Sequence, residues 1–264
     1  MKILYIAELV SKAGVFTFKK ALNELKTHYK WDLMIVCADS ATGGNGLGRS
    51  HAAYIHKLGA DVITLGDCCF FKKDLTENLD TMHYVLRPEN LNPQAPGIGS
   101  FLYKTGSNGQ KAAVVVFLGQ NSFNRLHASS PFANLNSILE RLKKQTPYII
   151  IDFHAQASAE KKTFFYAADG LCSAVIGSHT KVQTADEAIL PGGTAIISDA
   201  GRTGSQQSVG GCEINSRIKE YLSGIPDWTK DAWDDLELQG VFLDIGKDGK
   251  ALSIERVRIK VDSG

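Results

Sequence analysis

Residues 147–161 read PYIIIDFHAQASAEK, and this stretch decides the class of fold. Its apolar, β-branched run predicts a buried strand over 148–153, which delivers His154 at its carboxyl end. Residues 172–186 read CSAVIGSHTKVQTAD and repeat the arrangement, with an expected strand over 172–176 followed by His179. In α/β proteins, sites assemble where the carboxyl ends of such strands meet, so these two segments predict a site.

The rest of the chain alternates short apolar runs with amphipathic stretches, which indicates an α/β protein. Further strands are expected over 2–7, 32–38, 61–65, 112–118 and 194–198, and a closing hairpin over 240–260 turns at KDGK. Helices are expected over 13–28, 48–58, 71–81, 132–145 and 213–222. No low-complexity linker separates the halves, so we expect a single domain over residues 1–264.

Composition excludes several classes of protein. The 264 residues include 29 Lys and Arg against 28 Asp and Glu, so the chain lacks the basic excess expected of a general nucleic-acid binder. The longest apolar runs, 112–118 and 148–151, are far shorter than the about 20 residues that a membrane helix needs. The cysteines number five, without a CxxC pair, which disfavours a zinc knuckle and favours a reducing, cytoplasmic location.

Polar residues that could bind a metal follow five of the expected strands. Glu8, Asp39 and Asp67 follow the first three strands of the chain, and His154 and His179 follow two later ones. Carboxylates combined with neutral imidazoles suit Mn, Fe or Zn. Two such ions held about 3.5–4 Å apart are the usual clamp for hydroxide attack on a phosphoryl centre. The pattern therefore indicates a metal-dependent hydrolase.

Four segments carry a resemblance to a known family. The segments IDFHAQASAEK and VIGSHTKVQTAD, with GADVITLGDCC (59–69) and LPGGTAIISDAGRTG (190–204), resemble a bacterial branch of the calcineurin-like metallophosphoesterases. Members of that branch are described as 2′,3′-cyclic-nucleotide 2′-phosphodiesterases. The resemblance implies a four-layer α/β sandwich, with two central mixed β-sheets flanked by helices. It also implies hydrolysis of a small-molecule phosphodiester or a nucleotide.

The family's site residues are carried over one position at a time, and most of them differ here. His154 and His179 keep the family residue. The others are Glu8 for the first Asp, Asp39 for the bridging Glu, Ser40 for the Asn after it, Asp67 for the ligand Asn, Cys68 for the His beside it, and Lys181 for the last His.

These differences affect the two metal positions unequally. By the resemblance, one ion would be held by ligands that remain competent, namely Asp39, Asp67, His154 and His179. The other ion would need Glu8, Asp39 and the last histidine, which is Lys181 here. A protonated lysine can replace a cation, and one divalent ion plus Lys181 would balance the three carboxylates. We expect one divalent transition metal (Mn, Fe or Zn), or none, rather than two.

The resemblance also implies roles in catalysis and substrate binding. Cys68 stands where a histidine would protonate the leaving oxygen, and Lys181 would stabilise phosphoryl charge. Ser40 and Arg202, the latter in the Gly-x-Thr-Gly turn at 201–204, would contact the substrate. A cysteine-phosphatase role for Cys68 is disfavoured, because Asp74 occupies the position where that mechanism needs an arginine.

Several alternatives stay open at this point. Because most of the site positions differ, the chain could be a catalytically inactive homologue that binds a ligand or a partner protein. The Gly-rich segment 43–48 is typical of a flexible loop, and it could also offer backbone amides to a phosphate. Trp228 and Trp233 lie in the acidic segment 226–237, which is typical of a lid or an oligomer contact, so a homo-oligomer is also left open.

Overall fold

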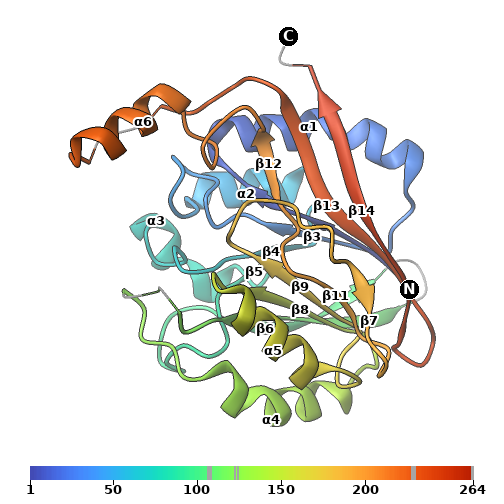
Figure 1. Cartoon of the computed structure of the whole chain (residues 1–264). Helices are drawn as coiled ribbons and strands as arrows, with labels where there is room; N and C mark the ends of the chain where they lie inside the picture. Colours follow the sequence, from blue (N-terminus) through green and yellow to red (C-terminus); the bar gives the residue numbers. More distant parts are fainter. Residues whose placement is uncertain (106–108, 122, 124, 227–229, 263–264) are drawn as a thin grey trace.

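Two β-sheets pack face to face in the computed structural model, and helices cover their outer faces (Figure 1). The structure describes residues 1–105, 109–121, 123, 125–226 and 230–262. This arrangement is the four-layer α/β sandwich, so the predicted fold class is confirmed.

The first sheet combines strands from both ends of the chain. Its order is β2 (Glu8–Leu9), β12 (Arg202–Ser205), β13 (Leu236–Ile245), β1 (Lys2–Ile6), β3 (Leu33–Cys37), β4 (Val62–Thr64) and β5 (Val85–Leu86), and β14 (Ala251–Val261) also pairs with β13. β1 runs parallel to β3 and antiparallel to β13, with Lys2 opposite Asp244. The predicted closing hairpin is confirmed, and its first strand, β13, lies between β1 and β14.

The second sheet comes from one continuous part of the chain. Its order is β10 (Ala188–Ile189), β11 (Ala195–Ile197), β9 (Ala174–Ser178), β8 (Ile149–His154), β7 (Gln110–Leu118) and β6 (Ser100–Thr105). β7, β8, β9 and β11 are mutually parallel, so their carboxyl ends share one edge. The expected strands of this region are confirmed, although β9 begins at Ala174 rather than at residue 172.

Helices bury apolar stripes against the outer face of each sheet. On α1 (Ser11–His28), the buried side chains of Phe18, Leu22 and Leu25 recur at helical spacing. α1 and α2 (Arg49–Lys57) pack on the first sheet, and α4 (Pro131–Lys143) and α5 (Ser158–Ala168) pack on the second. The helix α5 has no counterpart among the sequence-based expectations.

The prediction of a single helix over 71–81 is wrong. The chain forms α3 (Lys73–Thr76) and then a separate 3-10 turn, η1 (Leu79–Thr81). Asn78 stands between them, and its side-chain amide donates to the carbonyl oxygen of Asp74 at 2.8 Å. A short polar side chain that bonds to the backbone in this way competes with helix propagation, which explains the interruption.

The alternation of β8 directs polar side chains to the space between the sheets. Ile149, Ile151 and Phe153 pack toward α4 and α5, and Ile150 packs between the sheets. Because strand side chains alternate, Asp152 and His154 share the inner side with Ile150. The Asp152 carboxylate accepts hydrogen bonds from Tyr5 of β1 at 2.7 Å and from Thr64 of β4 at 2.5 Å. Asp152 thus ties the second sheet to the first beneath the strand ends.

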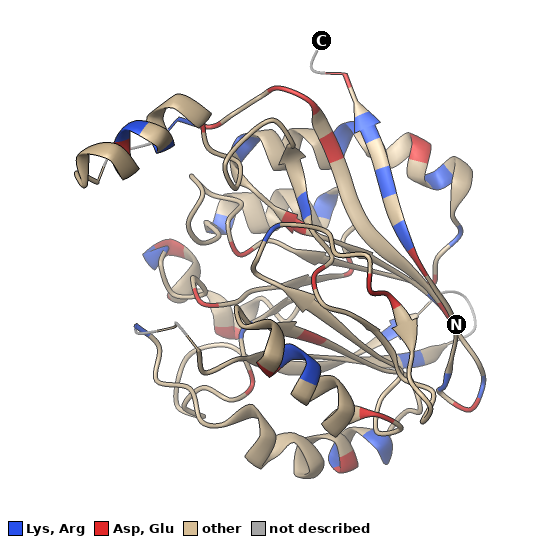
Figure 2. Cartoon of the chain, viewed as in Figure 1, with Lys and Arg blue, Asp and Glu red and all other residues tan. Residues whose placement is uncertain are grey.

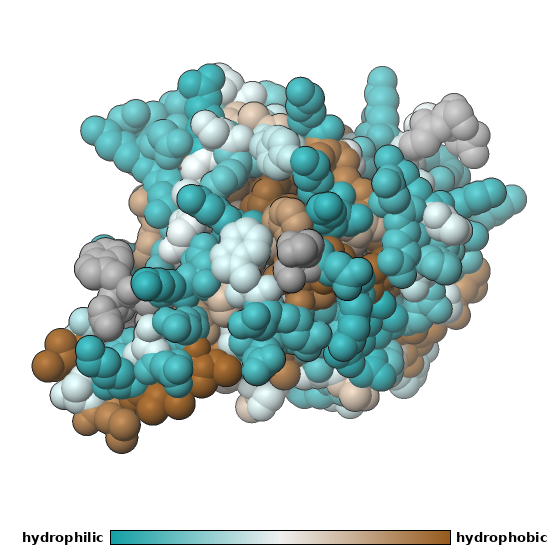
Figure 3. All heavy atoms as spheres, turned by 90° about the horizontal axis from the view of Figure 1, so that it is seen from above, coloured by the Kyte–Doolittle hydropathy of each residue, from teal (hydrophilic) through white to brown (hydrophobic). Residues whose placement is uncertain are grey.

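The surface carries charges of both signs and one apolar helix. Figure 2 shows a row of basic residues along β14, and each of them pairs with an acid: Arg256 with Glu187, Arg258 with Glu237, and Lys260 with Asp235. α6 (Ile214–Ser223) projects from the body in Figure 1, and exposed apolar side chains there contribute to the brown patch of Figure 3. They are Ile214, Ile218 and Leu222, and Ile225 just after the helix is also exposed.

The exposed apolar side of α6 does not by itself identify an oligomer contact, so the homo-oligomer stays a prediction. Trp233 is partly exposed and meets the ring of Phe16 edge-on at 5.8 Å, whereas Trp228 lies outside the described residues. No helix in the described part of the chain is both long enough and apolar enough to cross a membrane.

Candidate metal centre

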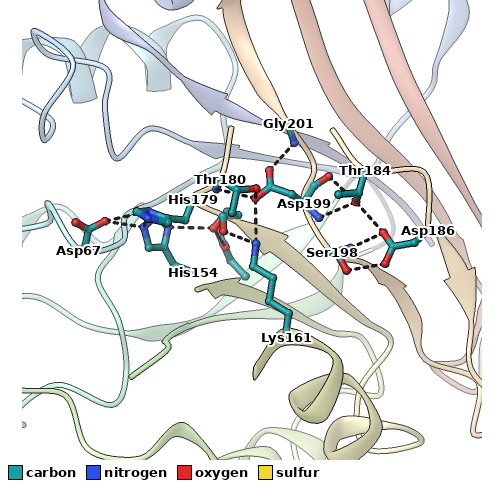
Figure 4. A network of polar contacts seen from close by, with 12 residues as sticks. Asp67, His154, Lys161, His179, Thr180, Thr184, Asp186, Ser198, Asp199 and Gly201 are labelled. Atoms are coloured by element: carbon teal, nitrogen blue, oxygen red, sulfur yellow. Dashed lines mark hydrogen bonds and ion pairs between the residues drawn. The ribbon is translucent and has the colours of Figure 1, made fainter. Parts of the chain in front are cut away.

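Three side chains from different strand ends converge on one point (Figure 4). Asp67 follows β4, His154 ends β8 and His179 follows β9. Nε2 of His154 lies 2.8 Å from Oδ1 of Asp67 and 3.1 Å from Nδ1 of His179. Nδ1 of His179 lies 3.4 Å from the same Asp67 oxygen. A carboxylate and two imidazole nitrogens that meet in this way form a donor set typical of a divalent transition metal.

A chain of hydrogen bonds fixes the ring of His154. The Ser178 hydroxyl donates to Oδ1 of Asp152 at 2.7 Å, so its oxygen is free to accept a hydrogen bond from the N–H at Nδ1 of His154 at 3.0 Å. When the ring is neutral and carries its proton on Nδ1, the lone pair of Nε2 is available to a metal ion, as in metal-binding histidines. Gly66 lies against this ring, and a Cβ at that position would be 2.3 Å from it. Only glycine therefore fits beside His154 in this conformation.

The charge around His154 favours binding of a proton or a metal ion. Burial alone lowers the pKa of the His154 imidazole, but the Asp67 hydrogen bond and the carboxylate of Asp39 outweigh burial and raise it to about 9. A metal needs the neutral imidazole, so an ion and a proton compete for this nitrogen. The cluster therefore has a strong electrostatic preference for a positive charge.

Asp39 lies at the base of the cluster and orders the loop that carries Asp67. Its Oδ1 accepts the backbone N–H of Gly66 at 2.7 Å, and its Oδ2 accepts that of Cys68 at 3.0 Å. Oδ2 is also 3.8 Å from Nε2 of His154. Burial raises the pKa of Asp39 to about 7, although the nearby His154 lowers this pKa in part. Asp39, Asp67 and Cys68 make a second group whose ligand atoms lie within 4.8 Å of one another.

Glu8, Ser40 and Lys181 form a second cluster beside the first. The Ser40 hydroxyl donates to Oε1 of Glu8, and Nζ of Lys181 lies 3.0 Å from the Ser40 oxygen and 3.4 Å from Oε1. Burial lowers the pKa of Lys181, but Glu8 and Asp39 outweigh it and raise the pKa above its usual value. Lys181 is therefore held as an ammonium ion. Oε2 of Glu8 is buried and finds no hydrogen-bond partner among the described residues.

A buried ion pair holds the loop that carries His179 and Lys181 (Figure 4). Both residues have positive φ, at 98° and 62°, which costs non-glycine residues on the order of 1–3 kcal/mol. Oδ2 of Asp199 accepts the backbone N–H of Thr180 at 2.8 Å and its hydroxyl at 2.7 Å. The same oxygen accepts Nζ of Lys161 at 3.0 Å, and Lys161 also donates to the carbonyl of Ser178 at 2.9 Å.

Sequence reasoning missed both Lys161 and Asp199. Asp199 directly follows the strand expected over 194–198, so the rule that selected the other strand-end residues would have found it. Lys161 gave no comparable signal, because a lysine on a helix is normally exposed, and this one is only 2 % exposed.

Arg202 acts on Lys181 in this structure. Its Nη1 donates to the carbonyl oxygen of Lys181 at 2.7 Å, and its Nε donates to that of Ser205 at 2.9 Å. Nη2 donates to the carbonyl of Gln206 at 3.1 Å. The guanidinium therefore secures the backbone of Lys181, and the contact with substrate expected for Arg202 stays a prediction.

The Cys68 thiol lies at the edge of the metal cluster. Its Sγ is 3.7 Å from Oδ2 of Asp67. Burial raises the pKa of this thiol far above its usual value, and the negative charges of Asp39 and Asp67 raise it further. Cys68 therefore keeps its proton, which agrees with the interpretation that it is not a thiolate nucleophile.

Comparisons with known proteins find a matching family and similar relatives. Residues 4–257 match the family described as YmdB-like protein. A Bacillus subtilis (strain 168) protein named 2′,3′-cyclic-nucleotide 2′-phosphodiesterase is 36% identical over 263 residues, which cover 99% of this chain and 98% of the relative.

Solved structures share the fold. The crystal structure of a novel phosphatase from Mycoplasma pneumoniae superposes with a TM-score of 0.91 at 29% identity, covering 98% of this chain and 93% of that one. A 5′-nucleotidase precursor from Thermus thermophilus gives a TM-score of 0.61 at 11% identity and covers 98% of this chain and 54% of its own. At that identity the nucleotidase shows a shared fold alone.

Proposed function

Because this chain belongs to the YmdB-like protein family, we propose that it is a metal-dependent phosphodiesterase acting on a phosphodiester or a cyclic nucleotide. The observation that carries the proposal is the convergence of Asp67, His154 and His179 at the strand ends. The name of the B. subtilis relative supports the substrate class.

The residues present fit one divalent ion. Asp39, Asp67, His154 and His179 would hold it, and Mn, Fe or Zn matches these donors. When bound, the ion would polarise a phosphoryl oxygen and lower the pKa of water.

Lys181 would take the place of a second cation. Its ammonium already pairs with Glu8, and Ser40 and the Arg202 contact to its carbonyl hold it there. An ammonium fixed beside the metal cluster can donate to a phosphoryl oxygen and stabilise the charge that develops on it. Glu8 and Ser40 would thus order Lys181, with Ser40 close enough to the substrate to contact it.

Cys68 would supply the proton for the leaving oxygen. The thiol is protonated, and it lies next to Asp67 on the loop that Asp39 secures. Transfer of its proton to the leaving alkoxide would give an alcohol and a thiolate, which the solvent reprotonates. A thiol with so high a pKa is a weak acid, so we expect slow turnover.

Metal content and hydrolysis test the proposal. Protein purified without chelator should contain one transition-metal ion per chain, and two tightly bound ions would contradict the role given to Lys181. Hydrolysis of bis(p-nitrophenyl) phosphate and of a 2′,3′-cyclic nucleotide should depend on added Mn, Fe or Zn. The His154→Ala/His179→Ala variant is the control, and turnover no higher than in this variant would refute an enzyme.

The double variant Cys68→His/Lys181→His addresses the alternative of an inactive homologue. If the natural protein has no activity and this variant gains it, the inactive interpretation is favoured. We further propose a cytoplasmic location and a small-molecule substrate. Free thiols on Cys37, Cys68, Cys69, Cys172 and Cys212 support the reducing compartment.

A further inference from the structure

A cavity of about 560 Å³ adjoins the candidate site at Lys181. Its volume is within the roughly 300–1,000 Å³ that small-molecule sites occupy. A second hollow, of about 410 Å³, is lined by residues 230–234 and by the start of α6, and Lys181 is not among its lining residues. Of these two cavities, only the larger one shares a residue with the metal and phosphoryl machinery.

Chain continuity joins the walls of this cavity to the site. Val10 and Ser11 directly follow β2, which begins with Glu8. Gly43 and Asn45 belong to the Gly-rich loop that follows Ser40. Because Lys181 itself lines the cavity, a phosphoryl group bound at Lys181 would lie at the edge of this hollow.

The far wall offers a hydrogen-bond donor that the protein does not use fully. Arg217 of α6 lines the cavity, and its side chain pairs with Glu220 through Nη1 at 2.6 Å. Its Nε is buried without an acceptor in the part of the chain that the structure describes. A guanidinium has five N–H donors, so Arg217 retains capacity for an acceptor on a ligand.

The charge of this wall favours a neutral ligand group over a second anion. Glu220 already neutralises Arg217, and the carboxylate of Asp231 also lines the cavity. Val10 and Val209 add apolar surface. A donor, an acceptor and apolar walls together suit a sugar or a base, whereas another phosphate would be repelled by Asp231.

We propose that this cavity binds the neutral organic part of the substrate, a nucleoside when the substrate is a cyclic nucleotide, and that Arg217 and Asp231 determine specificity. This inference rests on the proposed phosphodiesterase function. The metal cluster and Lys181 would hold the phosphate, and the cavity would select among phosphodiesters by what is attached to it.

The test compares two substrates in three variants. Arg217→Met removes the donors and keeps most of the apolar stem, Asp231→Asn removes the charge, and Lys219→Ala on the exposed side of α6 is the matched control. For 2′,3′-cyclic AMP, Arg217→Met should raise KM about tenfold with kcat within about twofold, the effect of one lost hydrogen bond. Neither value should change for bis(p-nitrophenyl) phosphate, which lacks the sugar and the base.

Equilibrium dialysis with adenosine 3′-monophosphate separates this inference from the proposed function. Binding that Arg217→Met weakens about tenfold, and Lys219→Ala leaves intact, supports the cavity even if the natural protein hydrolyses neither substrate. If the nucleotide binds in this way but the natural protein hydrolyses neither substrate, the proposed function is refuted and the cavity proposal stands. Equal KM values in Arg217→Met and the natural protein, or no binding of the nucleotide, would overturn the cavity proposal. Since α6 has no buried residues and Asp231 is only partly buried, loss of folding is not expected in these variants.

Discussion

Two consecutive lysines of α5 provide a matched test of how the His179–Lys181 loop is held. Lys161 is 2 % exposed and pairs with Asp199, which is 1 % exposed. Lys162, one position later, pairs with Asp186, but these side chains are 44% and 30% exposed. The substitutions Lys161→Met and Lys162→Met remove the same ammonium group from the two environments.

We expect the two substitutions to lower the free energy of unfolding by very different amounts. Lys161→Met leaves the Asp199 carboxylate buried without its cation and also deprives the Ser178 carbonyl of a donor. Removal of one partner from a buried ion pair costs about 3–5 kcal/mol. Asp199 keeps its bonds from Thr180 and Gly201, which places the expected loss of unfolding free energy near the lower value, about 3 kcal/mol. Lys162→Met should cost less than about 1 kcal/mol, as for other partly exposed pairs.

Urea denaturation followed by circular dichroism measures both free energies of unfolding. Equal losses in the two variants would refute the reasoning, because burial would then make no difference to the pair. A second readout is metal content, which Lys161→Met should lower through the displacement of His179 and which Lys162→Met should leave unchanged.

Further predictions concern single positions near the cluster. Gly66→Ala should displace the His154 ring, because the new Cβ would lie 2.3 Å from it, and metal analysis should show loss of the ion while circular dichroism still shows a folded chain. Iodoacetamide at pH 8 should alkylate Cys212 before Cys68, since Cys68 is buried and its raised pKa leaves almost no thiolate; peptide mass spectrometry that found Cys68 modified first would contradict this. Lys181→His should raise the metal content toward two ions per chain, and an unchanged content would show that Lys181 does not occupy a cation position.

Several strands could be predicted because they are short, mainly apolar runs that are buried on both faces. This holds for β3 and β8, whose residues are all buried. The helix α5 was missed for the opposite reason. Glu160 and Lys161 occupy buried positions on it, so charged residues interrupt the apolar stripe from which a helix would be inferred. Tertiary partners, which no local pattern encodes, compensate these charges.

The candidate site was likewise predictable only in part from the sequence. The positions of Asp67, His154 and His179 followed from the rule that parallel strands deliver polar residues at one edge. What Arg202 contacts could not be inferred, because its partners are backbone carbonyls of Lys181, Ser205 and Gln206. Such contacts depend on the path of two loops, and the side-chain sequence does not specify that path.

The two sheets also differ in when they can form during synthesis. The second sheet uses one uninterrupted stretch, from β6 to β11, so its pairings are available as soon as that stretch has left the ribosome. In the first sheet β13 pairs with β1. Lys2 therefore cannot pair with Asp244 until the C-terminal part of the chain has been synthesised. The imidazoles of His154 and His179 are therefore in place before the sheet that carries the carboxylates is complete. The metal cluster, which takes its side chains from both sheets, would then be completed only when the two sheets pack together.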